Sequence, residues 1–193
     1  DPLELFSQWY AEVDREPDNV IFEANAMTLA TVGENGMPHA RIVLLKAYSS
    51  DGYVFFTNYD SCKGLDIAHN PNVSLLFWWP TFFRQVRIEG RVEKLAAHES
   101  DRYFSQRPIE SQLAACASSQ SQPLLSKQQL LDRYREIEST LNQGAQLSRP
   151  QHWGGYIISP HQYEFWQGCS HRMHDRFQYS RSGGSWSLSR LSP

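Results

Sequence analysis

The feature that most constrains the fold of this 193-residue chain is a succession of short segments rich in β-branched and aromatic residues. Turn-forming residues rather than helices separate most neighbouring segments, and strands connected so closely can pair only in antiparallel fashion. The sequence therefore predicts a mainly β fold with flanking helices, an antiparallel barrel in a single domain that spans residues 1–193. The expected strands cover residues 26–33, 39–48, 53–58, 73–79, 84–95, 153–159, 162–167, 171–179 and 186–191.

Turn and capping residues predict how these strands and the helices begin and end. Asn35-Gly36 predicts a hairpin between the first two strands. Asp1 before Pro2 is typical of a helix start, and Ser61 is a suitable cap for a short helix that ends before Pro71. Helical periodicity is expected over residues 97–107 and 123–141, on either side of a polar loop at 116–122.

Composition and charge exclude several classes of protein. The net charge is −3 and the pI is about 6.2, so a general nucleic-acid-binding surface is not expected and any anion site must be local. The three cysteines are widely spaced without a CxxC motif, which favours a reducing, cytoplasmic location. The longest apolar run, VSLLFWW, is too short to span a bilayer, and the first residues lack the pattern of a signal peptide. We expect a soluble protein without nucleic-acid or membrane partners.

The segment HRMHDRF at residues 171–177 carries a cation at every second position. If it is a strand, Arg172, His174 and Arg176 all project from one side of the sheet. Such a row requires compensation by solvent, by a neighbouring carboxylate or by an anionic ligand. His171 and His174 are three positions apart and would face opposite sides of a strand, so no metal site is predicted.

Three clusters of cations and hydroxyl groups have the composition of phosphate sites: Arg41 with Lys46, Ser61 with Lys63, and Tyr103 with Arg107 and Ser111. Each cluster also has a simpler interpretation. The first pair can be the solvated ends of a buried strand, Ser61 can be only a helix cap, and the last three residues can be an exposed helical face. Together, and with the aromatic segment FWQG at 165–168, they favour a flat aromatic ligand that carries phosphate.

The sequence resembles the pyridoxamine 5′-phosphate oxidases over nearly its whole length. The resemblance is carried in order by RIVLLK, by FTN followed by SCK, by RQVRIEG, by SQRPIESQ, and by the ending EFWQG, HRMHDRF and WSLSRLSP. It implies an FMN-binding split β-barrel that works as a homodimer with FMN at the subunit interface, in which the C-terminal segment 150–193 serves dimerisation and the active site. The implied reaction oxidises pyridoxine 5′-phosphate or pyridoxamine 5′-phosphate to pyridoxal 5′-phosphate, with O2 reduced to H2O2 and ammonia released from the amine.

The resemblance also implies roles for individual residues. Arg41 and Lys63, with Ser61 nearby, match ligands of the FMN phosphate. Further matches to cofactor contacts are Ile42, Val43, Leu44, Phe56, Thr57, Gln85, Gln120, Ser121, Trp166 and Arg176, some given by the partner subunit. Matches to the grip on the substrate phosphate are Lys46, Tyr103, Arg107 and Ser111. Arg172 and His174 match the pair over the pyridine ring and are the predicted catalytic residues.

Three departures from the family pattern keep other functions open. Cys62 stands where the family usually has Arg, Cys169 and Ser170 replace the usual Gly and acidic residue, and the family's N-terminal segment is absent from the sequence. The alternatives are a flavin reductase that uses a nicotinamide donor, a non-catalytic carrier of FMN or pyridoxal phosphate, and a barrel that binds single-stranded nucleic acid.

Overall fold

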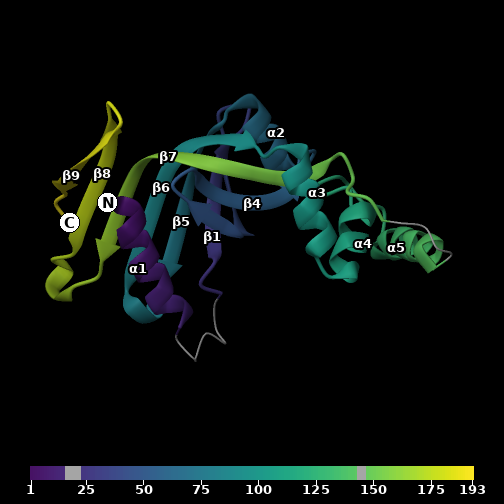
Figure 1. Cartoon of the computed structure of the whole chain (residues 1–193), viewed down its shortest axis with the longest axis horizontal. Coiled ribbons are helices and arrows are strands. Elements are labelled where there is room, and N and C mark those ends of the chain that lie inside the picture. The colour runs from purple at the N-terminus through teal and green to yellow at the C-terminus, as the bar shows by residue number, and fades with distance from the viewer. Residues whose placement is uncertain (16–22, 143–146) are drawn as a thin grey trace.

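A nine-stranded antiparallel sheet forms the centre of the part of the chain that the computed structural model describes, residues 1–15, 23–142 and 147–193 (Figure 1). The strand order is β2-β1-β5-β6-β7-β4-β3, with β8 paired to β7 and β9 paired to β8. The predicted mainly β class with flanking helices is confirmed: the sheet curls into a split half-barrel. The strands are β1 (Ala26–Val32), β2 (Pro38–Leu44), β3 (Ala47–Ser49), β4 (Gly52–Asn58), β5 (Asn72–Trp79), β6 (Arg84–Lys94), β7 (Trp153–Gln167), β8 (Asp175–Ser182) and β9 (Ser185–Arg190).

Strand β7 connects the two parts of the sheet. Its first half, from Trp153 to Ile158, pairs with β4. Its second half, from Gln162 to Gln167, pairs with β8, while β6 pairs with almost its whole length. The sheet therefore divides along β7, with β4 and β3 at one end and β8 and β9 at the other (Figure 1).

The two strands expected over 153–159 and 162–167 are one strand of 15 residues, so that boundary was wrong. The register with β6 shifts between Glu89 and Gly90, and Gly90 pairs with Pro160. A Cβ atom on Gly90 would lie 2.6 Å from the carbonyl oxygen of Ser159, so glycine is required for this close approach. A β-bulge at Gly90 thus accommodates Pro160, which lies between the two segments that were expected to be separate strands.

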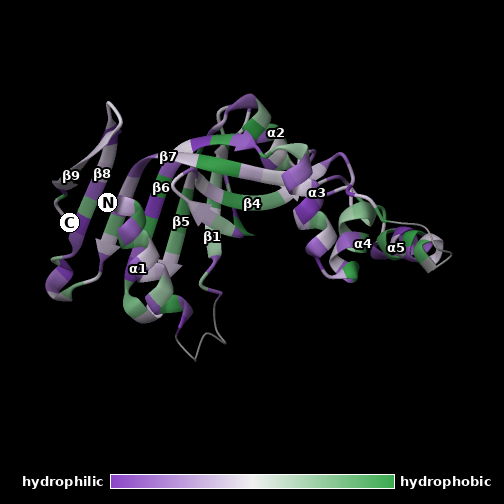
Figure 2. Cartoon of the chain, viewed as in Figure 1, coloured by the Kyte–Doolittle hydropathy of each residue, from purple (hydrophilic) through white to green (hydrophobic). Residues whose placement is uncertain are grey.

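The hairpin and the first helix are confirmed. β1 pairs with β2 through a turn in which Gly36 has a φ of 77°. The backbone N–H of Leu3 donates to the carboxylate of Asp1, which caps α1 (Pro2–Asp14). This helix lies on the sheet and buries Phe6 completely among the rings of Tyr53 and Phe77, and apolar residues gather where helix and strands meet (Figure 2).

The remaining helices lie beside the β4 end of the sheet, with α3 to α5 extending away from it (Figure 1). Their bounds are α2 (Cys62–His69), α3 (Ala97–Gln106), α4 (Ile109–Ala117) and α5 (Lys127–Asn142), and two 3-10 turns cover Pro80–Phe82 and Ser170–Arg172. α4 was not expected as a separate helix, and α5 begins four residues later than expected. No helix in the described ranges is long and apolar enough to cross a bilayer.

The prediction of a strand over 171–179 was wrong in its first part. His171 and Arg172 have φ values of 57° and 60°, within a 3-10 turn, and β8 begins only at Asp175. Residues in the left-handed region do not alternate between the faces of a sheet. Arg172, His174 and Arg176 therefore do not form the single strand row that their spacing suggested.

Candidate functional site

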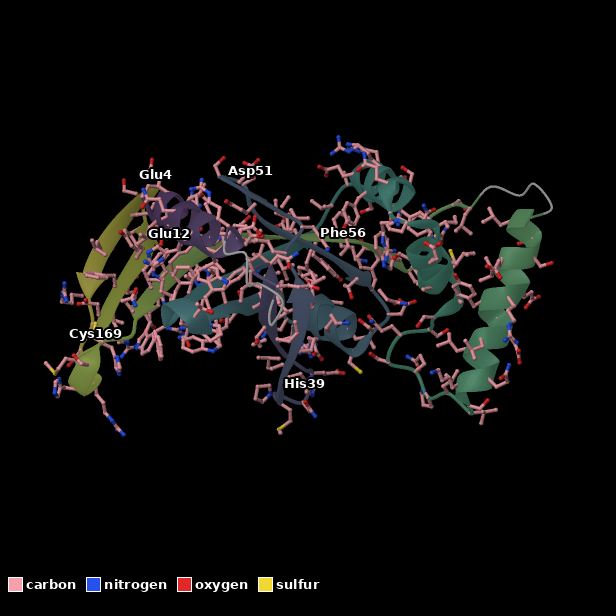
Figure 3. The ribbon with its side chains drawn as sticks, turned by 90° about the horizontal axis from the view of Figure 1, so that it is seen from below. Glu4, Glu12, His39, Asp51, Phe56 and Cys169 are labelled. Atoms are coloured by element: carbon pink, nitrogen blue, oxygen red, sulfur yellow. The ribbon has the colours of Figure 1, made fainter. Side chains whose placement is uncertain are left out.

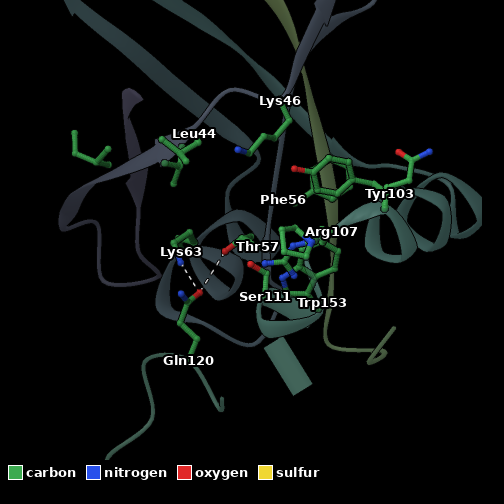
Figure 4. Close-up of a pocket in the computed structure, with 14 residues that line it drawn as sticks. Leu44, Lys46, Phe56, Thr57, Lys63, Tyr103, Arg107, Ser111, Gln120 and Trp153 are labelled. Carbon is green, nitrogen blue, oxygen red and sulfur yellow. Dashed lines mark hydrogen bonds between the residues drawn. The ribbon is translucent and has the colours of Figure 1, made fainter. Parts of the chain in front are cut away.

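A pocket of about 530 Å³ opens between the sheet and the helices α2, α3 and α4 (Figure 4). It is formed by the end of β2, the middle of β4, the start of β7, the first turn of α2 and the junction between α3 and α4. The lining residues are Ile42, Val43, Leu44, Lys46, Phe56, Thr57, Lys63, Tyr103, Gln106, Arg107, Pro108, Ser111, Gln120 and Trp153.

Lys63 is buried on one side of this pocket and is held by neutral oxygen atoms. Its ammonium group donates to Ser61 Oγ at 3.1 Å and to Gln120 Oε1 at 2.8 Å (Figure 4). Ser61 is the N-cap of α2, so free helical N–H groups lie beside the same cation. Burial, together with the charge of Arg41, lowers the pKa of Lys63. In the described ranges Lys63 forms no ion pair, and a bound anion would stabilise its charged form.

Arg107 lies on the opposite side of the pocket with an incompletely satisfied guanidinium group. Its Nη1 atom is buried and has no hydrogen-bond partner within the described part of the chain. The group lies 4.6 Å from the ring centroid of Trp153, and burial lowers its pKa. A buried donor without a partner is costly in a folded protein, so this atom is suited to an acceptor on a bound anion.

The predicted cluster around Arg107 does come together, although not on one helix. α3 ends at Gln106, Arg107 is extended with φ −71° and ψ 151°, and α4 begins after Pro108. Tyr103 and Ser111 therefore reach the pocket from two helices, and Tyr103 is stacked on Phe56 with 3.8 Å between centroids. Lys46, just beyond β2, completes the group (Figure 4).

Arg41 is not among the lining residues. Its guanidinium donates to Thr31 Oγ1 at 2.7 Å and to the carbonyl of Leu29 at 3.2 Å, and lies 3.7 Å from Asp66. Asp66 is buried and also accepts from Thr31 at 2.6 Å and from His39 at 2.9 Å. Asp66 was not predicted as a site residue, because its spacing in α2 is that of an ordinary helical residue.

A second group of predicted residues lies at the other end of the sheet. Gln85, Trp166 and Arg176 occupy one cross-strand row, because Gln85 pairs with Trp166 and Trp166 pairs with Arg176. The ring of His174 lies 4.6 Å from that of Trp166. Arg172 is exposed in the preceding 3-10 turn. Two further predicted residues, Ser61 and Ser121, do not line the pocket. Ser61 accepts a hydrogen bond from Lys63 and Ser121 follows Gln120 in the sequence, and both Lys63 and Gln120 do line it.

The hydrogen bonding of His174 defines which ring nitrogen carries a proton. The backbone N–H of Cys169 donates to His174 Nδ1 at 3.1 Å. Nδ1 must therefore be an acceptor, and the proton of the neutral ring lies on Nε2. In this arrangement His174 offers a hydrogen-bond donor at Nε2.

The two groups are far apart within one chain. Trp153 lines the pocket and Trp166 belongs to the second group, and both lie on β7, at opposite ends (Figure 1). At about 3.3 Å per residue the path along the strand is roughly 40 Å. One chain alone therefore does not bring all the predicted site residues together.

The fold and the pocket define a protein of the split-barrel class. An FMN-binding protein from Nostoc punctiforme has the same fold, with a TM-score of 0.78 and 16% identity over 100% of this chain and 98% of that one. Residues 13–141 match the family model described as "Pyridoxamine 5′-phosphate oxidase", and residues 153–193 match "Pyridoxine 5′-phosphate oxidase C-terminal dimerisation region". The chain belongs to the pyridoxamine 5′-phosphate oxidase family, a family of oxidoreductases.

Relatives with similar sequences and structures agree with this assignment. The pyridoxine/pyridoxamine 5′-phosphate oxidases of Bordetella petrii and Paraburkholderia phytofirmans are each 50% identical to this chain, covering all of it and 89% of their own length. The crystal structure of PhzG from Burkholderia lata, in complex with tetrahydrophenazine-1-carboxylic acid, has a TM-score of 0.91 and 30% identity, covering 100% of this chain and 93% of that one.

Proposed function

We propose that this protein is an FMN-dependent oxidase that converts pyridoxine 5′-phosphate or pyridoxamine 5′-phosphate to pyridoxal 5′-phosphate. The electrons pass to O2, which leaves as H2O2, and the amine substrate also releases ammonia. The observation that carries the proposal is the buried Nη1 of Arg107, which has no hydrogen-bond partner among the described residues and lies in one pocket with Lys46, Tyr103 and Ser111. These are donors from separate elements, arranged as a phosphate site requires.

The pocket also contains groups that fit the phosphate and ring of FMN. Lys63, with Ser61 and the first turn of α2, is suited to a phosphate, and Thr57 and Gln120 add polar groups beside it. Ile42, Val43 and Leu44 provide a partly apolar wall for a flat ring system. When bound, FMN accepts a hydride from the substrate.

The chain's own residues then act mainly by holding the substrate. Lys46, Tyr103, Arg107 and Ser111 bind its phosphate, which fixes the position of the ring. His174 donates a hydrogen bond from Nε2, and Arg172 adds positive charge from the adjacent turn. We assign these two residues to the catalytic contacts at the pyridine ring.

Both groups can contribute to one site if two subunits associate. The matched C-terminal region carries the second group, and it is described as a dimerisation region in this family. We infer a homodimer in which Trp166, His174 and Arg176 of one subunit lie over the pocket of the other, with FMN at the interface. A cytoplasmic location and the absence of a nucleic-acid partner remain predictions.

The test is anaerobic mixing of the FMN-loaded protein with pyridoxine 5′-phosphate while flavin absorbance is recorded. We expect bleaching of the flavin, its recovery when O2 is admitted, and one H2O2 for each pyridoxal 5′-phosphate formed. Unphosphorylated pyridoxine is the matched control and should bleach the flavin far more slowly. If the flavin stays oxidised with both compounds, the protein is a carrier and the proposal is wrong. Bleaching by a nicotinamide donor alone would instead identify a flavin reductase.

A second candidate is the oxidation of a larger carboxylated ring compound. The structure of PhzG supports it, because that protein was crystallised with a tricyclic carboxylic acid. A carboxylate can also pair with Arg107. The same anaerobic assay with tetrahydrophenazine-1-carboxylic acid distinguishes the two: the preferred substrate is the one with the higher kcat/KM, and we expect it to be the phosphorylated pyridine.

A further inference from the structure

Glu164 is a buried carboxylate that joins two arginines on the face of the sheet that carries Arg176. Only 5% of its surface is exposed, although it lies in the second half of β7 on the side away from the apolar core. Its neighbours Tyr163 and Phe165 point into that core. The residue is therefore covered by the side chains beside it, which are charged.

The two oxygen atoms of Glu164 have different partners. Oε1 accepts from Nε of Arg176 at 2.8 Å and lies 2.8 Å from its Nη2. Oε2 accepts from Nη2 of Arg87 at 2.7 Å, on the neighbouring strand β6. Burial alone would raise the pKa of Glu164, but the hydrogen bonds from Arg87 and Arg176 hold it below its ordinary value. The carboxylate is thus charged and shared at neutral pH.

Each arginine also has a second partner, and the two differ. Arg87 forms an ion pair with Glu89. Arg176 donates from Nη1 to the carbonyl oxygen of Ser192 at 2.9 Å. Glu164 is therefore the one carboxylate that contacts Arg176 in the described ranges, and it fixes the side of the guanidinium that Ser192 does not hold.

We propose that Glu164 is a positioning residue that holds Arg176 in the orientation in which it contacts the flavin. The inference rests on the proposed function, since Arg176 is assigned to the cofactor there. The carboxylate limits the rotation of a long side chain before the cofactor arrives, so less conformational entropy is lost on binding.

The decisive variant is Glu164→Gln, with Glu89→Gln as the matched control. The amide keeps one acceptor and places an N–H group against the other arginine, so the shared contact is broken. Both substitutions remove one carboxylate from Arg87, but only the first removes it from Arg176. We expect Glu164→Gln to raise the Kd for FMN about tenfold and Glu89→Gln to leave it unchanged.

A double-substitution cycle separates positioning from general support of the sheet. Arg176→Gln should weaken FMN binding by itself, and adding Glu164→Gln to it should cause no further loss, because Glu164 acts through Arg176. Losses that multiply in the double variant would overturn the proposal. The KM for pyridoxine 5′-phosphate, measured with saturating FMN, should be the same in Glu164→Gln and the wild type, since Glu164 acts on Arg176, which is assigned to the flavin and not to the substrate.

The outcomes distinguish this proposal from the proposed function. If wild-type protein binds no FMN, the proposed function fails first. If the wild type binds FMN and Arg176→Gln weakens it while Glu164→Gln does not, only the positioning role is wrong. Should Glu164→Gln not fold, Glu164→Asp is the second variant: it keeps the negative charge, but its shorter side chain draws the carboxylate away from Arg176, and the same rise in Kd is expected. An unchanged Kd in Glu164→Asp would contradict the proposal.

Discussion

The side chain of Arg41, in the RIVLLK motif, contacts residues that lie outside that motif. The family resemblance assigns it to the FMN phosphate, yet here its guanidinium contacts Thr31 and lies close to Asp66, neither of which lines the pocket. Asp66 also contacts His39, which is labelled in Figure 3. Asp66 offsets part of the positive charge that a phosphate would meet. The local charge is therefore lower than the RIVLLK motif alone suggests.

Asp66 should make the stability of the protein depend on pH. Burial raises its pKa, but hydrogen bonds from Thr31 and His39 have the larger combined effect, so its folded pKa lies below its ordinary value. The unfolded chain then binds the proton more tightly, and the stabilisation is present at neutral pH and is lost as the pH falls through the folded pKa. We expect Asp66→Asn to unfold with about 1–2 kcal/mol less free energy at pH 7. Urea unfolding should show this difference shrinking below about pH 4. A difference that is constant with pH would contradict the assignment.

Cys62 should limit the affinity for FMN. It is the first residue of α2, directly precedes Lys63 and is exposed. A guanidinium at this position would add a charge-assisted contact worth about 1.5–3 kcal/mol. Fluorescence titration should therefore give a lower Kd for Cys62→Arg than for the wild type. Cys62→Ser is the control for loss of the thiol. If all three proteins have the same Kd for FMN, Cys62 does not limit the affinity for the cofactor.

Among the helices, the break between α3 and α4 matters most for the site. Pro108 disfavours a helical conformation at the preceding residue, and Arg107 is indeed extended. Gln112 donates to the carbonyl of Arg107 at 2.8 Å and stabilises this conformation. The break is what turns the Arg107 side chain into the pocket instead of along the helix.

Pro108→Ala should consequently weaken substrate binding without affecting FMN. Without proline, α3 can extend through residue 107, which moves the guanidinium away from Lys46 and Ser111. We expect the KM for pyridoxine 5′-phosphate to rise roughly tenfold, while the Kd for FMN stays at its wild-type value. Pro123→Ala, in the exposed segment before α5, is the matched control. The same KM in both variants would show that the proline does not set the position of Arg107.

The elements that were predicted correctly are those whose ends are determined by capping or turn residues close in the sequence. Asp1, Ser61 and Asn35-Gly36 each define a cap or turn by their own hydrogen bonding, and the structure confirms all three. The failures are at positions where tertiary contacts override local preference. His171 and Arg172 adopt left-handed conformations that their residue types do not favour, and the bulge at Gly90 depends on a partner strand. The pocket around Arg107 was predicted as a set of residues, but not the helix break that forms it.

The whole molecule places its two groups of site residues at opposite ends of β7. This separation gives a physical reason for a dimer, because neither end alone has both the phosphate-binding groups and the His174 region. The end near α2 also exposes Ile42 and Leu65, which are 64% and 56% accessible in the single chain. Apolar side chains exposed on an edge strand and an adjacent helix are suited to an interface.

A subunit-mixing experiment tests the shared site directly. Arg107→Gln removes a residue assigned to the substrate phosphate, and Arg172→Gln removes a residue assigned to catalysis at the other end of β7. Each variant alone should therefore form inactive dimers. When the two are unfolded together and refolded, half of the dimers are mixed, and each mixed dimer contains one site with both substitutions and one with neither. If each site combines both subunits, activity should recover to about a quarter of the wild type. Mixing Arg107→Gln with Lys46→Met, which affect the same end, is the control and should restore nothing. If the first mixture also stays inactive although mixed dimers are detected by mass spectrometry, the site lies within one subunit and the proposed interface is wrong.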